Sequence, residues 1–118
     1  MNLKILSIHE KGDASKEYVL LEVVADCDLD YYAIADTTYT GDGNISNKLR
    51  HFYWFAAKEV KKGERLVLRT GKGKNDTYKT DAGTTVHRFF WGLGSPVWND
   101  DGDAALLIQM KTWKATKA

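Results

Sequence analysis

The strongest constraint on the fold is a series of short apolar and aromatic runs with alternating character, each of which ends at a turn. Such runs occupy residues 2–9, 17–25, 29–39, 49–55, 65–70, 86–92 and 103–113. Period-2 alternation with β-branched and aromatic residues is typical of strands, and the Gly, Asn, Asp and Ser clusters between them are typical of turns. Because roughly six to eight strands with frequent turns suit two packed sheets, the sequence predicts an all-β fold, an immunoglobulin-like β-sandwich of two mainly antiparallel sheets.

The segments between the runs carry predictions of their own. A register break is expected in the first strand near Ser7, and residues 26–28 and 40–47 are predicted to form turns. Residues 56–60 are predicted to form a short helical turn. Residues 71–83 are the longest polar stretch, and their Gly, Asn and Asp content predicts a flexible surface loop.

Length and composition indicate one folded domain. The chain has 118 residues, 43% of them hydrophobic and 28% charged, which is typical of a globular protein with one packed core. We expect a domain over residues 1–114 and a C-terminal tail over residues 115–118. No apolar stretch approaches the roughly 18 residues that a spanning helix needs, so no membrane span is expected.

The N-terminus and the single cysteine predict a cytoplasmic location. Residues 1–10 become charged too early to supply the apolar core of a signal peptide. Cys27 is the only cysteine, whereas a secreted domain of this size more often carries an even set for disulfides.

Charge is distributed unevenly although the net charge is only +1. Residues 22–47 carry six acidic residues and no Lys or Arg, whereas residues 58–79 carry eight basic residues against three acidic ones. Such runs are commonly solvated faces. The alternative is that the basic segment contacts nucleic-acid phosphates, with Tyr53, Trp54 and Tyr78 available for stacking. The basic residues of this alternative are Lys58, Lys61, Lys62, Arg65, Arg69, Lys72, Lys74 and Lys79.

Known catalytic and metal-binding motifs do not fit. Asp26-x-Asp28-x-Asp30 resembles the start of a calcium loop, but Tyr31 and Thr37 stand where that loop needs Gly and an acid. Residues 71–74 lack the spacing of a phosphate-binding loop. We therefore expect no metal, no cofactor and no small-molecule substrate.

Candidate catalytic side chains also lack a recognisable arrangement. A hydrolase would need a nucleophile beside a base, and Cys27 with His9, His51 or His87 forms no known motif. His87 next to Arg88 could contact an anion, but the expected role of His87 is that of an ordinary histidine on a strand face. The sequence predicts a protein that is not an enzyme.

Two segments resemble the lamin tail domain. Residues 90–92 and 97–106 read FWG and VWNDDGDAAL, which is similar to the "WN-x-x-GD-x-x-x-L" entry to that family's last strand. Residues 17–22 and 29–36 resemble its "EYVEL" and "DLSGW-x-L-x-D" strands, and residues 52–68 resemble its "F-x-F…L-x-x-G…L-V-L" hairpin. The resemblance covers residues 1–114. The residues that match the family pattern are Asp36, Trp91, Trp98, Asn99, Gly102 and Asp103.

Structural roles are expected for these residues. Trp98 should plug one end of the sandwich, with its indole N–H donating to a carbonyl. Asn99 and Asp103 should accept backbone N–H groups in the turn before the last strand, and Asp36 should anchor a turn at the end of its own strand.

The resemblance implies an interaction or scaffold module. Lamin-tail-like domains mediate contacts with proteins, and in nuclear lamins also with chromatin, so a protein-binding or assembly role is the first hypothesis. Nucleic-acid (DNA) binding through residues 58–79 is the alternative. A third hypothesis is self-association, through an edge strand or through charge pairing of residues 22–47 with residues 58–79 of another copy.

Overall fold

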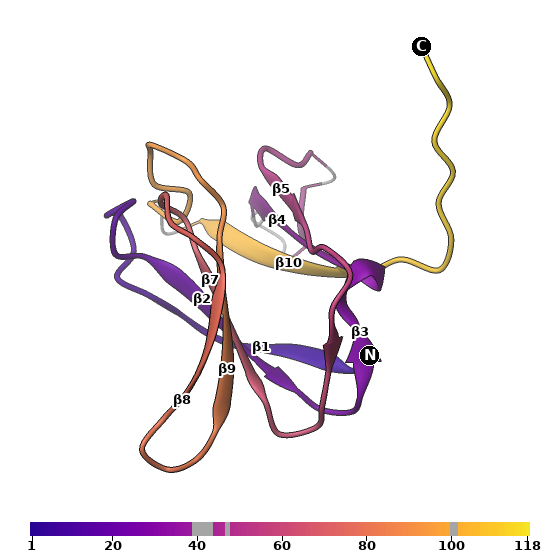
Figure 1. Ribbon diagram of the computed structural model, residues 1–118. Coiled ribbons are helices and arrows are strands. Elements are labelled where there is room, and N and C mark those ends of the chain that lie inside the picture. Colours follow the sequence, from indigo (N-terminus) through magenta and orange to yellow (C-terminus); the bar gives the residue numbers. More distant parts are fainter. Residues whose placement is uncertain (39–43, 47, 100–101) are drawn as a thin grey trace.

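Two main sheets pack face to face around one core in the computed structural model, which describes residues 1–38, 44–46, 48–99 and 102–118 (Figure 1). The larger sheet has the strand order β1-β2-β7-β9-β8, and the strands are β1 (Leu3–His9), β2 (Tyr18–Val23), β7 (Arg65–Arg69), β9 (Thr85–Phe90) and β8 (Asp76–Lys79). The second sheet has the order β10-β4-β5, with β10 (Asp103–Gln109), β4 (Tyr32–Thr38) and β5 (Phe52–Trp54). A short pair joins β3 (Cys27–Asp28) to β6 (Glu59–Val60), and a 3₁₀ turn, η1, covers Leu29–Tyr31.

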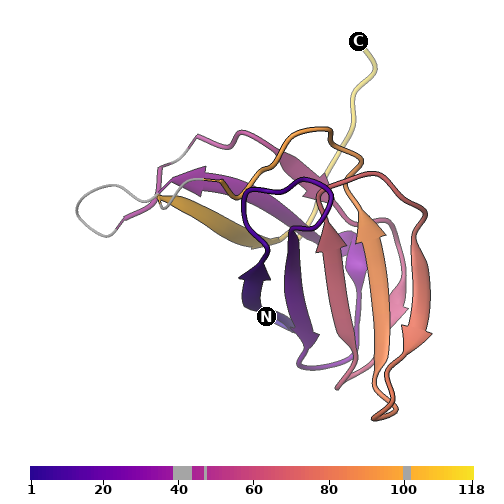
Figure 2. The same ribbon diagram turned by 90° about the vertical axis from the view of Figure 1, so that its left-hand side faces the viewer.

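The predicted all-β sandwich of mainly antiparallel strands is confirmed. All strand pairs are antiparallel except β7 with β9, which run parallel within the five-stranded sheet (Figure 2). The predicted break in β1 is present, because its register with β2 shifts between Ile5 and Ser7. Within the described residues, no helix has the length and apolar content needed to cross a membrane.

Alternation decides which side chains of the five-stranded sheet enter the core. In β2, Val19, Leu21 and Val23 are buried, and the residues between them lie on the opposite face and are half-buried. Strand β4 differs, since it is buried from Tyr32 to Thr37, as expected for a strand covered on one face and sheltered on the other. It is the central strand of its sheet, between β10 and β5.

The predicted loop over residues 71–83 is wrong in its centre. Asp76–Lys79 forms β8, which pairs antiparallel with β9 from Asp76 opposite Arg88 to Lys79 opposite Thr85. All four residues of β8 are exposed, so the strand lacks the buried, apolar half of the alternation that marks a strand in sequence. Its partner strand, and not its composition, makes this segment a strand.

Three shorter predictions are also corrected. Residues 56–60 contain no helical turn, because Glu59–Val60 pairs with Cys27–Asp28, the segment predicted as a simple turn. The run 29–39 begins with η1, where the Asp28 carboxylate accepts the Asp30 N–H, and only then becomes β4. The predicted turn over 40–47 lies largely outside the described residues.

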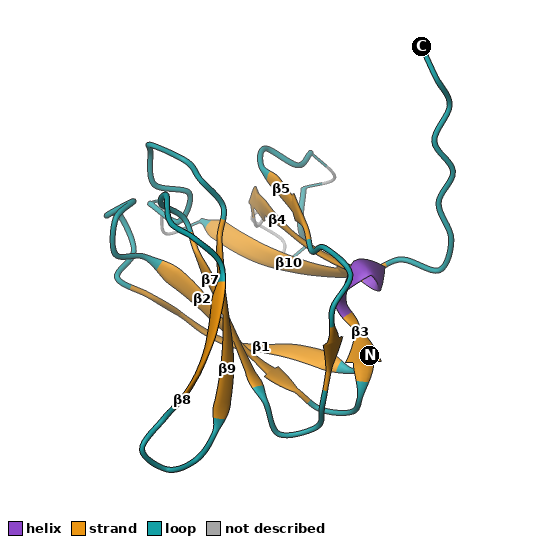
Figure 3. Ribbon diagram, viewed as in Figure 1, coloured by secondary structure: helices purple, strands orange, loops and turns teal. Residues whose placement is uncertain are grey.

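Two predicted strands, over residues 49–55 and 103–113, are shorter in the structure. The run 49–55 supplies only Phe52–Trp54 to a sheet. β10 ends at Gln109, and residues 110–118 continue without regular secondary structure (Figure 3). Trp113 still contacts the body of the molecule, since its ring lies edge-on to Trp54 and Tyr31, with centroids 5.0 and 5.5 Å away.

Candidate functional site

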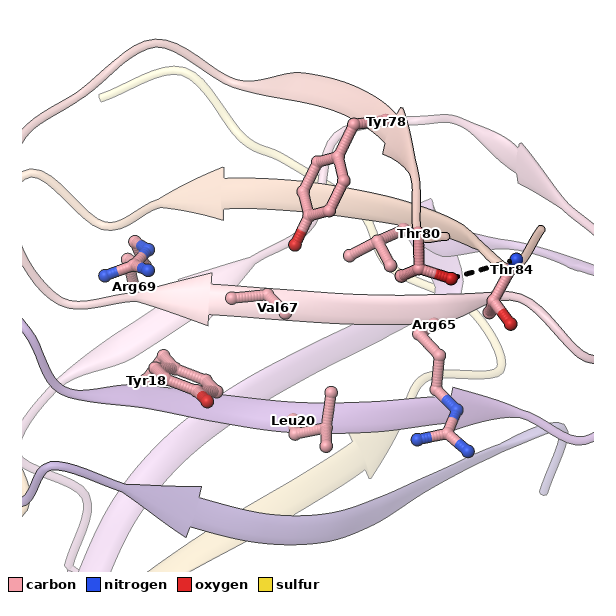
Figure 4. Close-up of a pocket in the computed structure, with 9 residues that line it drawn as sticks. Tyr18, Leu20, Arg65, Val67, Arg69, Tyr78, Thr80 and Thr84 are labelled. Carbon is pink, nitrogen blue, oxygen red and sulfur yellow. Dashed lines mark hydrogen bonds between the residues drawn. The ribbon is translucent and has the colours of Figure 1, made fainter. Parts of the chain in front are cut away.

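The outer face of the five-stranded sheet, which points away from the core, has a shallow depression of about 370 Å³. We call it the outer hollow (Figure 4). Its lining residues come from β2, β7, β9, β8 and the turn after β8, and they are Tyr18, Leu20, Arg65, Val67, Arg69, Tyr78, Thr80, Thr84 and Val86. Alternation places the β2 and β7 members opposite the core residues of the same strands. An aliphatic floor thus lies between tyrosine and arginine side chains.

Two kinds of arginine lie on this face. Arg88 of β9 forms two hydrogen bonds with the Asp76 carboxylate, at 2.9 and 2.6 Å, and its guanidinium lies 5.3 Å from the Tyr78 ring centroid. These hydrogen bonds hold the pKa of the Asp76 carboxyl below its usual range. The charge of Arg88 is therefore already neutralised.

Arg65 and Arg69 differ from Arg88. Neither forms an ion pair with any described residue. Arg69 lies over the Tyr18 ring, 5.4 Å from its centroid, and its Nε is buried without a hydrogen-bond partner in the described part of the chain. Figure 4 shows the two side chains at opposite ends of the hollow along β7, with Val67 between them. The hollow therefore combines an apolar centre with two arginines that form no ion pair with a described residue.

Trp98 lies where the sequence motif predicts, at one end of the core. Its side chain is 1% exposed and lies next to Trp91, at a centroid distance of 6.4 Å. The expected hydrogen bond from its indole N–H is wrong, because Nε1 is buried with no partner among the described residues. Shape and apolar contact, and not a hydrogen bond of the ring, hold Trp98 in place.

Glu17 is the residue that sequence reasoning missed. It is 0% exposed, and its two carboxylate oxygens accept the backbone N–H groups of Val97 and Trp98 at 2.8 and 3.0 Å. It therefore holds the segment that delivers Trp98 to the core. No local signal identifies this role, since the partners are 80 and 81 residues apart in the chain.

His51 contacts both Asp36 and Trp91, two of the residues that match the family pattern. Asp36 is 2% exposed and accepts the backbone N–H of His51 at 2.6 Å, with the His51 Nδ1 at 3.1 Å. The His51 ring lies edge-on to Trp91. Asp36 lies within β4 and fixes the chain just before β5; the turn that it was expected to anchor after its strand lies largely outside the described residues.

The remaining motif residues lie around the start of β10. Asn99 is exposed, Asp103 begins β10 opposite Thr38, and a Cβ at Gly102 would lie in ordinary contact with the Thr38 side chain. Their expected turn involves residues 100 and 101, which lie outside the described part of the chain.

The eight basic residues of the nucleic-acid hypothesis do not share one face. Lys58 donates to Thr77 Oγ1 at 2.9 Å, and Lys61 lies 3.6 Å from the Asp26 carboxylate. Arg65 and Arg69 line the outer hollow, whereas Lys79 has the opposite orientation to Tyr78 on β8. Lys62, Lys72 and Lys74 are exposed in loops. The structure therefore divides this set among several surfaces.

The chain has no detected relative. No family model, curated protein or solved structure matches it. The resemblance to lamin tail domains stays a prediction.

Chemistry at the other candidate residues is limited by their surroundings. Burial and the adjacent Asp28 and Asp26 carboxylates raise the pKa of the Cys27 thiol, which disfavours the thiolate that a nucleophile needs. Among the described residues, no group of three or more His, Cys, Asp or Glu side chains could hold a metal ion. His87 and Arg88 project to opposite faces of β9, so they do not form a common anion site.

His87 belongs to a polar network on the inner side of the sheet. It is 6% exposed, with Nε2 at 2.9 Å from Glu64 Oε1 and Nδ1 at 3.1 Å from Thr77 Oγ1. Glu64 also accepts the backbone N–H of Lys61 at 2.8 Å. Burial raises the pKa of the Glu64 carboxyl, but the hydrogen bonds from His87 and Lys61 lower it by more, so the pKa lies below its usual value.

This lowered pKa predicts an acid-dependent loss of stability. Because the folded state binds the proton less tightly than the unfolded chain, Glu64 stabilises the fold fully above about pH 4.5, and the effect is lost as the pH falls through the folded pKa. Urea unfolding of Glu64→Gln at pH 6 and pH 3 should therefore show a smaller drop in midpoint than the wild type. Glu59→Gln, at an exposed position on β6, should keep the wild-type drop. An equal drop in all three proteins would contradict this assignment.

Proposed function

We propose that the chain is a non-catalytic binding module of the lamin-tail type, which engages a partner protein through the outer hollow. The observation that carries this proposal is the composition of the hollow, in which Tyr18, Tyr78, Arg65 and Arg69 surround an aliphatic floor on the open face of the sheet. Tyr and Arg are enriched at the centres of protein interfaces, where they contribute most of the binding energy.

The strands beneath the hollow hold its side chains in defined positions, which suits a binding role. β7 lies between β2 and β9, so its backbone is hydrogen-bonded on both sides and its outward side chains have fixed origins. Arg69 and Tyr18 hold each other in contact across neighbouring strands. Side chains that are already ordered lose less conformational entropy on binding.

Nucleic-acid binding has weaker support. The basic residues are divided among several surfaces, and the outer face also carries the acidic Asp76 and Glu22. Binding of a polyphosphate backbone depends on many phosphate contacts made together on one surface, which basic residues divided among several surfaces do not supply. The hollow therefore favours a protein partner.

Site-specific crosslinking tests this proposal with a matched control. The photoreactive residue p-benzoylphenylalanine replaces Tyr78 in the hollow, or Tyr31 elsewhere; the two tyrosines are 41% and 45% exposed. In an extract of the native cells, we expect a protein that crosslinks from position 78 and not from position 31. The same purified protein should bind the wild type and Tyr31→Ala, and bind Tyr78→Ala at least about tenfold more weakly, since an interface tyrosine commonly contributes more than 1 kcal/mol.

Three results would change the conclusion. Crosslinks of equal yield from both positions would remove the hollow as the binding site. A nucleic acid crosslinked from position 78, with affinity that falls steeply with salt and is lost in a Lys72→Glu, Lys74→Glu, Lys79→Glu variant, would establish the alternative function. A second copy of the chain crosslinked there, with a mass doubled in light scattering, would identify the module as one of self-assembly.

A further inference from the structure

We propose that the outer hollow recognises an extended acidic segment of the partner, in which two carboxylate side chains flank an apolar one and pair with Arg65 and Arg69. This inference rests on the proposed function and specifies the chemistry of the partner. Its recognition pattern is acidic-x-apolar-x-acidic, read by side chains on the face of the sheet.

Charge complementarity is the first reason. Arg65 and Arg69 form no ion pair among the described residues, although Glu22 lies opposite Arg65 on β2. Arg69 as a whole is only half-buried, and a carboxylate is the strongest acceptor that a protein partner can supply to a guanidinium.

The same face contains an example of the interaction. Arg88 stacks on Tyr78 and binds the Asp76 carboxylate through two hydrogen bonds. Arg69 stacks on Tyr18 in the same manner but lacks the carboxylate. A carboxylate from a partner would complete at Arg69 the arrangement that Asp76 completes at Arg88.

Spacing is the second reason. Arg65, Val67 and Arg69 occupy alternate positions of β7, so their side chains leave the same face, and the two arginine Cα atoms are about 13 Å apart. An extended peptide places its residues i and i+4 at the same separation and its residue i+2 on the same side. In a helix, residues i and i+4 are only about 6 Å apart, which does not span the arginines.

The apolar centre of the pattern follows from the floor of the hollow. Val67 lies between the arginines with Leu20 opposite it on β2, and Val86, which also lines the hollow, lies opposite Arg65 on β9. An aliphatic side chain at i+2 would therefore meet an aliphatic surface. Strand addition is not the mode of binding here, because both edges of β7 are already paired, with β2 and β9.

Fluorescence anisotropy with defined peptides tests this inference on the full chain. The probe is a fluorescein-labelled peptide with the central sequence Glu-Ser-Leu-Ser-Glu. We expect at least about tenfold weaker binding for Gln-Ser-Leu-Ser-Gln, and weaker binding for Glu-Ser-Ser-Ser-Glu, since the first loses both charge-assisted pairs and the second loses the apolar contact. Binding of the probe should weaken between 50 and 300 mM salt by about tenfold or less, because only two ion pairs are involved.

Matched charge variants complete the test. Arg65→Gln with Arg69→Gln should lose binding of the probe, whereas Arg50→Gln with Lys62→Gln removes two positive charges outside the hollow and should keep it. Equal binding by the two double variants, or equal affinity of the wild type for the Glu and Gln peptides, overturns the inference. The peptide comparison on the wild type decides the matter even if the arginine variant fails to fold.

Failure of this inference is distinguishable from failure of the proposed function. If the partner crosslinked from position 78 loses affinity on Tyr78→Ala but not in the arginine double variant, the module binds through the hollow and the acidic pattern is wrong. A duplex oligonucleotide that displaces the probe with higher affinity than the unlabelled peptide also overturns it.

Discussion

Glu17→Ala should lower the free energy of unfolding by roughly 3–5 kcal/mol, because it leaves two buried backbone N–H groups without their charged acceptor. The carboxylate is fully buried and binds the N–H groups of Val97 and Trp98, so its loss also releases the segment that places Trp98 in the core. Glu17→Gln keeps one acceptor oxygen and presents an N–H to the other donor, so its expected cost is about 2 kcal/mol.

Urea unfolding followed by circular dichroism measures these differences. Glu22→Gln is the matched control, since Glu22 lies on the outer face of β2, the strand that begins directly after Glu17, and is half-buried; its expected change is within about 0.5 kcal/mol. Amide hydrogen exchange gives a second measurement, in which Val97 and Trp98 should lose protection in Glu17→Ala. An unfolding midpoint of Glu17→Ala equal to that of the wild type would show that the pair of hydrogen bonds does not stabilise the fold.

Trp98→Ala should cost about 3–5 kcal/mol, the usual range for removing a fully buried large aromatic side chain. Trp98 is the largest fully buried side chain of the described core, and the cavity left behind would open between Trp91 and the strand ends. Trp98→Phe should cost only about 1–2 kcal/mol, because the indole N–H has no hydrogen-bond partner to lose and the change removes mainly volume.

The control for this series is another tryptophan. Trp113 is 45% exposed and contacts two rings at the surface, so Trp113→Ala should change the free energy of unfolding by less than about 1 kcal/mol. A cost for Trp98→Phe as large as that for Trp98→Ala would mean that the indole N–H does find an acceptor. Equal, small costs for Trp98→Ala and Trp113→Ala would remove Trp98 from the core.

Trp98 and Glu17 differ in how well their roles could be predicted from the sequence. Trp98 could be placed in the core because a large aromatic side chain beside an Asn/Gly/Asp turn at the start of an apolar run has few other stable positions. Glu17 could not be assigned, because an acid at the start of a strand has the same local sequence whether it faces water or binds a distant backbone. Only its position beside the segment 97–98 gives it a role.

The candidate site shows the same division. Every lining residue of the outer hollow except Thr84 belongs to a predicted strand or to the misassigned segment 71–83, and alternation predicts which face each strand residue occupies. Alternation does not predict which strands pair with each other. Arg69 meets Tyr18 because β7 pairs with β2, and Tyr78 joins them because β8 extends the sheet beyond β9. The basic segment, continuous in sequence, is divided by the same pairings.

The sequence by itself determined the all-β class and most of the strand positions, because period-2 patterning depends only on neighbouring residues. Tertiary structure alone decided that a polar, exposed segment becomes β8, that Glu17 holds Trp98, and that two arginines on an open sheet face form no ion pair with a described residue. The physical reason is that these properties depend on contacts between residues distant in the chain, which strand pairing and packing create and which local composition does not encode.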